Sequence, residues 1–141
     1  MNKSIRKSAF ETNSSSTHSL VISNNVTVLE TLPVDSNGNL DIYGMDFGWG
    51  PERYNDAASK LSYCFLDSQG NNDMTDLLKE SVIEYLNSVF IPCKNITFHE
   101  NDGYIDHQSC GTSHEVFHSK KDIINFIFNR DCELIIDNDN G

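Results

Sequence analysis

The abundance of Asn and Ser constrains the fold of this chain more than any other feature, because each occurs sixteen times in 141 residues. Both side chains hydrogen-bond to nearby backbone, which favours turns and helix caps over long helices. With 38% hydrophobic and 10% aromatic residues, the chain is too apolar to be disordered. We therefore expect one domain, residues 1–141, built from short elements around a core.

Two β-rich stretches near the N-terminus predict a tight hairpin. Residues 20–23 and 26–30 are separated by an Asn-Asn pair at 24–25, and this pair tolerates positive φ in a two-residue loop. A turn cluster at 35–39 then precedes an alternating stretch that begins at Leu40. The three strands are expected to form a meander.

Apolar residues at helical spacing predict three helices. The first covers residues 51–66, because proline is favoured at a first helical position. The second is capped by Asp73 and ends before Pro92. The third is opened by Ser119, with Asp122 three residues further on.

A second hairpin is predicted around the Asp-Gly pair at 102–103, which is a strong turn signal. Its strands are residues 96–99 and 104–108. With a two-residue loop, this register puts His99 opposite Asp106, so that the two form a cross-strand pair.

Two more short strands complete the expected fold. They are residues 115–118 and 132–136, and the segment 137–141 after them is expected to be a frayed end. Groups of strands interrupted by helices predict an α+β domain, with a mostly antiparallel sheet built from hairpins and about three helices.

The net charge of -11, from 10 basic and 21 acidic side chains, excludes several partners. Such a charge repels nucleic acid and anionic lipid, so direct binding to either is not expected. Residues 1–10 contain Lys3, Arg6 and Lys7 but no acid. This basic arm is expected to lie on the acidic surface of the protein, and a nucleic-acid-binding arm is the alternative.

The sequence also predicts a soluble protein in a reducing compartment. It has no secretory signal at the N-terminus and no apolar run of the roughly 20 residues that span a bilayer. The four cysteines lack C-x-x-C spacing, which favours reduced cytosolic thiols over a disulfide framework. They are Cys64, Cys93, Cys110 and Cys132.

The most unusual segment is the hydroxyl-rich stretch 10–19 before the first predicted strand. Hydroxyls, amides and an imidazole can surround a phosphate, and turns of this kind form anion-binding concavities with their N-H groups. The alternative is a series of local turns that satisfy only their own backbone. The candidate ligand-binding residues here are Asn13, Ser14, Ser15 and Ser16, with His18 beside them.

Basic residues followed by F-E-T-N-S-S-S-T-H-S resemble the opening of small, mostly uncharacterised proteins of tailed bacteriophages and prophage-like regions. The resemblance extends to F-G-W-G at 47–50, Y-I-D-H-Q-S at 104–109 and N-F-I-F-N at 125–129. It implies a phage origin and a host-cytoplasmic setting, but it implies no activity.

Three further motifs bear on a site. Trp49 offers a flat face for a base or a sugar, or it covers the core. His107 and Ser109 match the H-x-S element that two-histidine phosphoesterases carry twice, yet it occurs only once here. His114 and His118 are four residues apart without the H-E-x-x-H pattern, so no metal site is predicted.

We therefore expect a phage accessory protein whose polar pocket binds a phosphate-containing, nucleotide-like ligand. Processing of this ligand by the same pocket is left open. His18 and His107 are the candidate proton-transfer residues, and Trp49, Asp106 and Ser109 join the hydroxyl-rich segment in binding. The alternative is an acidic inhibitor that binds a host protein by mimicking nucleic acid. The sequence leaves catalysis, any cofactor and the oligomeric state open.

Overall fold

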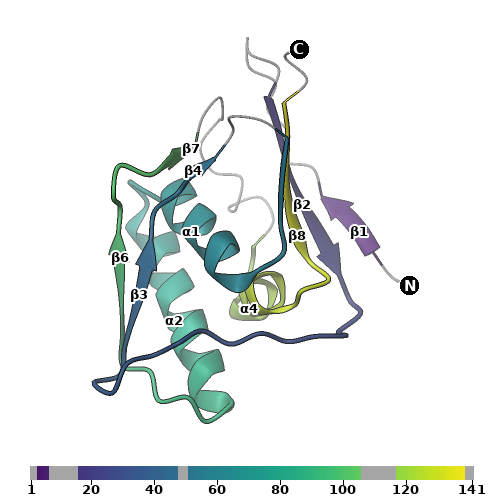
Figure 1. Cartoon of the computed structure of the whole chain (residues 1–141). Coiled ribbons are helices and arrows are strands. Elements are labelled where there is room, and N and C mark those ends of the chain that lie inside the picture. The colour runs from purple at the N-terminus through teal and green to yellow at the C-terminus, as the bar shows by residue number, and fades with distance from the viewer. Residues whose placement is uncertain (1–2, 7–15, 48–50, 106–116, 139–141) are drawn as a thin grey trace.

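The computed structural model describes residues 3–6, 16–47, 51–105 and 117–138. These residues form an α+β domain, as the sequence predicts (Figure 1). The described helices are α1 (Ala57–Asp67), α2 (Asn72–Ser88) and α4 (Lys120–Phe128). The strands are β1 (Lys3–Arg6), β2 (Ser16–Ser23), β3 (Asn39–Tyr43), β4 (Asp46–Phe47), β5 (Glu52–Tyr54), β6 (Asn95–His99), β7 (Tyr104–Ile105) and β8 (Glu133–Asn138).

The largest sheet has four antiparallel strands in the order β1-β2-β8-β5. Its inner side chains, Leu20 on β2 and Leu134 and Ile136 on β8, are fully buried. The predicted last strand is confirmed as β8, which runs on to Asn138, inside the segment predicted to fray. β1 forms one edge of this sheet, so Lys3–Arg6 of the basic arm is a strand.

The predicted N-terminal hairpin is wrong, because both edges of β2 are already paired, with β1 and with β8. Residues 26–30 instead run beside the connection between α4 and β8. The N-H of Glu30 donates to the Phe128 carbonyl at 2.8 Å, and the N-H of Arg130 donates to the Val28 carbonyl at 3.1 Å. Since the first two strands do not pair, the expected meander is absent as well.

A separate parallel ribbon covers the opposite side of the helices (Figure 1). β3 pairs with β6, and β4 pairs with β7, each in parallel. Parallel neighbours need a long crossover, and here β4, β5, α1 and α2 lie between β3 and β6 in the chain. α1 and α2 therefore lie between the ribbon and the four-stranded sheet.

The second predicted hairpin is also wrong, because β6 and β7 pair with β3 and β4 and not with each other. The turn between them is one residue earlier than predicted. Its central residues, Asn101 and Asp102, have φ of 50° and 58°, and the N-H of Gly103 donates to the Glu100 carbonyl at 2.7 Å. His99 therefore lies in β6 opposite Tyr43.

Side-chain caps set the starts of the helices. α1 begins after Asp56, which accepts from the N-H of Ser59, so the predicted start at residue 51 is wrong. Residues 52–54 form β5 and pair with β8, which supplies hydrogen-bond partners for their backbone. The cap of α2 is Asn71, two residues before the predicted cap.

The third helix confirms its predicted start, since Ser119 accepts from the N-H of Asp122. The strand predicted just before it is not found at Phe117 and His118, which have no regular secondary structure, and residues 115–116 lie outside the described part.

The core is centred on α1, in which every residue except Ala58 is buried. Its most unusual member is Lys60, which is fully buried. The Nζ atom donates to the carbonyls of Asn129 at 2.9 Å and Cys132 at 3.0 Å, and it lies 5.3 Å from the centre of the Phe126 ring. This cation ties α1 to the connection between α4 and β8.

Candidate functional site

Most of the site residues expected from the sequence lie outside the described residues. These are Asn13, Ser14, Ser15, Trp49, Asp106, His107 and Ser109. Ser16 and His18 belong to β2, where their backbones pair with Asn138 and Ile136. The expected meeting of the hydroxyl-rich segment with residues 106–109 therefore stays a prediction.

The described strand ends that flank these residues do lie at one end of the molecule. β2 begins, β4 ends, β5 begins and β7 ends toward the top of Figure 1. This arrangement is compatible with a site formed by the expected residues.

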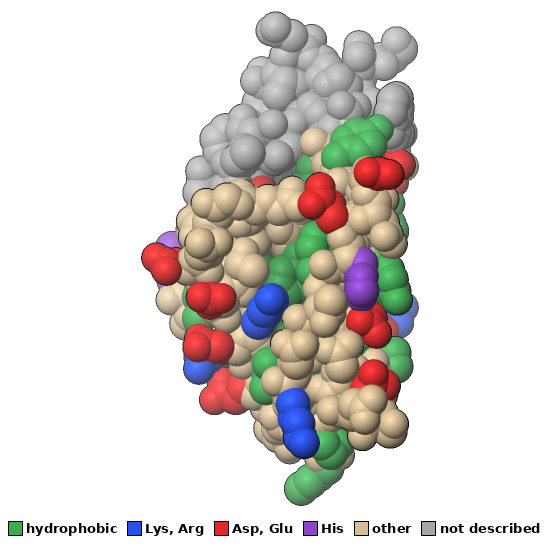
Figure 2. All heavy atoms as spheres, turned by 90° about the vertical axis from the view of Figure 1, so that its left-hand side faces the viewer, with side chains coloured by type: hydrophobic (Ala, Val, Ile, Leu, Met, Phe, Trp, Pro, Cys, Tyr) green, Lys and Arg blue, Asp and Glu red, His purple; other side chains and the backbone are tan. Residues whose placement is uncertain are grey.

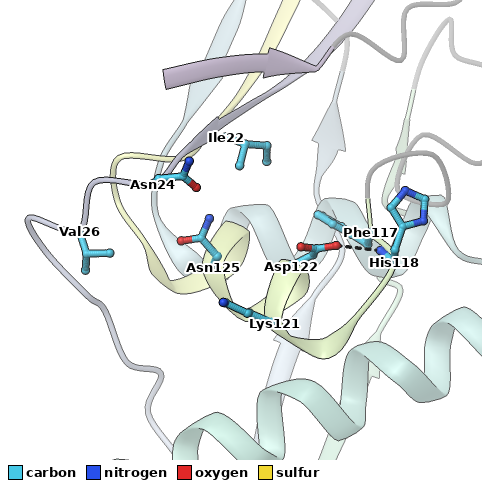
Figure 3. Close-up of a pocket in the computed structure, with 8 residues that line it drawn as sticks. All are labelled: Ile22, Asn24, Val26, Phe117, His118, Lys121, Asp122 and Asn125. Carbon is cyan, nitrogen blue, oxygen red and sulfur yellow. Dashed lines mark hydrogen bonds between the residues drawn. The ribbon is translucent and has the colours of Figure 1, made fainter. Parts of the chain in front are cut away.

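A pocket in the described part lies between the end of β2 and the start of α4 (Figure 3). Its volume is about 410 Å³. Eight residues line it, namely Ile22, Asn24, Val26, Phe117, His118, Lys121, Asp122 and Asn125. About 100 residues of sequence separate its two walls, so no local pattern could have revealed it.

The apolar part of the lining comes from Ile22, Val26 and Phe117. Phe117 is buried and packs against Phe126, with 5.4 Å between the ring centres. Val26 is 56% exposed. An apolar side chain on an open pocket wall can be covered by the flat apolar part of a ligand.

Asp122 is held in place by the start of α4. Its Oδ2 atom accepts from the backbone N-H of His118 at 3.0 Å, while its own N-H donates to Oγ of Ser119 at 3.3 Å (Figure 3). An acidic residue in the first turn is stabilised by the positive end of the helix dipole. The helix start is therefore already capped by the protein's own carboxylate.

Asn125 anchors the opposite wall of the pocket. Its Nδ2 atom donates to the Ser23 carbonyl at 3.2 Å, and its Oδ1 atom accepts from Nδ2 of Asn129 at 3.0 Å. Asn129 also donates to the carbonyl of Asn25 at 2.8 Å. These bonds fix the loop after β2, so the pocket is formed before any ligand arrives.

Lys121 supplies a cationic group that a ligand can meet, and the His118 imidazole lies on the same lining. Both residues are exposed, and Figure 3 shows Lys121 and Asn125 extending to the same side of α4. The neighbouring Lys120 does not line the pocket, and its Nζ atom lies 4.0 Å from Oε2 of Glu84 on α2. Adjacent lysines thus face different surroundings.

A second cluster of polar side chains lies on the outer face of β3 and β6. The Nε2 atom of His99 lies 2.8 Å from Oδ1 of Asp41, and its ring stacks on Tyr43 with 4.8 Å between centres. His99 therefore contacts Asp41, and its predicted partner Asp106 lies outside the described residues. Figure 2 shows this side of the molecule, where acidic side chains flank a short apolar strip.

The described part of the chain offers no group of three or more His, Cys, Asp or Glu that could hold a metal ion. Its cysteines, Cys64, Cys93 and Cys132, are buried, and Cys110 lies outside the described residues. Burial raises the pKa of the Cys64 and Cys93 thiols, so both stay protonated and are poor nucleophiles.

Within the described ranges, no helix combines the length and the apolar character needed to cross a bilayer.

Comparison of the chain with protein-family models, with curated proteins and with solved structures found no match.

Proposed function

We propose that this chain is a phage accessory protein that binds a phosphate-containing, nucleotide-like ligand in the host cytoplasm. The resemblance of the F-E-T-N-S-S-S-T-H-S opening to phage and prophage proteins supports the setting. The observation that carries the binding role is the pocket of about 410 Å³, which joins an apolar wall to Lys121 and His118. Pockets that bind small molecules have this size and this mixture of groups.

The chemistry of the lining matches the two parts of a nucleotide. Ile22, Val26 and Phe117 offer apolar contact for a base, while Lys121 and His118 can donate charge-assisted hydrogen bonds to a phosphate. Asn24 can both donate and accept at the edge of a base or a sugar.

The basic N-terminal strand lies beside this pocket. β1 carries Lys3 and Arg6, and its Ser4 pairs with Ile22, which lines the pocket.

The candidate residues Asp106, His107 and Ser109 lie outside the described residues. Binding itself requires only the described lining. His18 and His107 would be needed only if the ligand is also processed.

The proposal is tested by thermal unfolding of the full chain with a panel of nucleosides, nucleotides and inorganic phosphate. A ligand at 100 times its dissociation constant adds about 2.7 kcal/mol to the free energy of unfolding. We expect at least one phosphate-containing compound to raise Tm, Lys121→Gln to abolish the rise and Lys120→Gln to preserve it. No shift with any compound, or equal loss in both variants, would contradict the proposal.

A second candidate is the acidic inhibitor that mimics nucleic acid, and the exposed side of α2 favours it. This side carries Asp73, Asp76, Glu80 and Glu84, which are all exposed and spaced three or four residues apart. Carboxylates in a row can stand in for phosphates on a basic partner. Capture of a host nucleic-acid-binding protein that weakens steeply with salt would support this role, and salt-insensitive capture would contradict it.

A further inference from the structure

The charges on the pocket lining limit how much negative charge its ligand can carry. The lining holds one lysine, Lys121, one carboxylate, Asp122, and one histidine, His118. Its positive charge is therefore at most that of two side chains, with a carboxylate beside them. The chain as a whole, this lining included, has a net charge of -11.

Part of the backbone at the start of α4 is already occupied by the protein's own side chains. Two groups there are engaged with Asp122 and Ser119: the N-H of His118 donates to the Asp122 carboxylate, and the N-H of Asp122 donates to the Ser119 hydroxyl. Asp122 also neutralises the positive end of the helix dipole. These two N-H groups are not available to a bound phosphate, which can contact the side chains of Lys121 and His118 on the pocket lining.

One phosphate group matches this arrangement better than several. A terminal phosphate carries about -1.5 to -2 charges near neutral pH. Lys121 offers one positive charge and His118 a ring N-H donor to a single phosphate, whereas a triphosphate adds two further ionised groups that would meet Asp122 and no further lysine of the described lining. Salt screens this repulsion only in part, because the Debye length at physiological salt is about 8 Å.

The size and apolar wall of the pocket add a second restriction. Its volume of about 410 Å³ lies near the lower end of the usual range for ligand sites, roughly 300 to 1,000 Å³. Val26, which is 56% exposed, and Ile22 leave an apolar surface that a single base can cover. The pocket thus has room for one nucleoside unit.

We infer that the ligand is a mononucleotide with a single phosphate, its base on the Ile22 and Val26 wall and its phosphate at Lys121 and His118. This inference rests on the proposed function and narrows it to one class of ligand. It distinguishes nucleoside monophosphates from nucleosides, from triphosphates and from dinucleotides.

The test is calorimetric titration of the full chain with AMP, GMP, CMP and UMP, each compared with its nucleoside and its triphosphate. Divalent cations are omitted and the ionic strength is held constant, because both would screen the triphosphate. We expect one monophosphate to bind at least about tenfold more tightly than its nucleoside and its triphosphate, equivalent to about 1.4 kcal/mol. Lys121→Gln should reduce its affinity to that of the nucleoside, while Lys120→Gln should not.

The outcomes separate the two proposals. If a triphosphate binds as tightly as its monophosphate or more tightly, and Lys121→Gln abolishes binding, the inference is overturned and the proposed function stands. If none of the compounds binds, the proposed function fails and the inference fails with it.

Discussion

The Nζ atom of Lys60 in α1 donates a hydrogen bond of 2.9 Å to the backbone carbonyl of Asn129, just after α4. Lys60 is fully buried, and burial lowers its pKa from 10.5 to about 8. Asn129 in turn contacts Asn125 on the pocket lining. A buried cation in the core is thus linked through two asparagines to the candidate site.

Lys60 makes stability depend on pH in the alkaline range. Because its pKa is lower in the folded state, the unfolded chain binds more protons between about pH 8 and 10.5, so stability rises with pH there. The rise from this residue is on the order of 3 kcal/mol in the free energy of unfolding. Denaturant unfolding of wild type and Lys60→Met at pH 7, 8, 9 and 10 measures it.

Other groups that titrate in this range are present in both proteins. The difference between the two proteins in the free energy of unfolding therefore isolates the contribution of Lys60. The wild type should gain stability relative to Lys60→Met as the pH rises. If the free energies of unfolding of the two proteins change with pH in parallel, the pKa of Lys60 is not lowered in the folded state.

Gly44 and Gly103 are required where β6 and β7 pass the bend between β3 and β4. A Cβ atom on Gly44 would lie 2.0 Å from the Glu100 carbonyl oxygen, and one on Gly103 would lie 2.7 Å from the Gly44 carbonyl carbon. We expect Gly44→Ala and Gly103→Ala each to lower the free energy of unfolding by about 3 kcal/mol, because backbone must move.

Gly70→Ala is the control for these variants. A Cβ atom there meets nothing within 4 Å, although φ is +85°. Its cost should be about 1 kcal/mol, from backbone conformation alone. Denaturant unfolding measures the free energy of unfolding of each variant. Equal losses in all three alanine variants would refute the close approach of Gly44 to Glu100 and Gly103.

The ion pair between His99 and Asp41 should add little to stability. The side chains are 38% and 41% exposed, and pairs in such positions contribute about 0 to 1 kcal/mol. A double-mutant cycle of Asp41→Asn and His99→Gln should give a coupling within that range, while Asp46→Asn with His99→Gln should give none. A coupling well above this range would indicate a more enclosed site than the structure shows.

Asn129 should be among the most sensitive polar positions. It is fully buried, its Nδ2 atom reaches the carbonyls of Ser23 and Asn25, and its Oδ1 atom accepts from the N-H of Asp131. Asn129→Ala removes all of these hydrogen bonds from a buried position and should cost about 3 kcal/mol. Thermal or denaturant unfolding measures this loss, and a change under about 0.5 kcal/mol, the size usual for a surface substitution, would contradict the described network.

Local signals predicted the elements better than they predicted the pairing of strands. The cap at Ser119, the apolar stripe of α2 and the strands near residues 96 and 133 depend on neighbouring residues, so the sequence reveals them. Both predicted hairpins failed because the strands have partners far away in the chain, which hairpin signals cannot reveal.

The candidate site was harder to predict for the same reason. Lys121 and Asn125 are ordinary helix residues in the sequence, and they become pocket residues only because Asn129 and Ser23 bring the loop after β2 beside α4. His118 drew attention only through its spacing from His114. The Ser119 cap was the one local sign that a helix start lay nearby.

The location of the ligand site is tested most directly by backbone amide NMR shifts during titration with the tightest-binding nucleoside monophosphate. The account predicts that the largest changes fall on residues 22–26 and 117–125, which surround the pocket, with little change on β3 and β6. Changes concentrated on β3 and β6, or no change at saturating ligand, would contradict it.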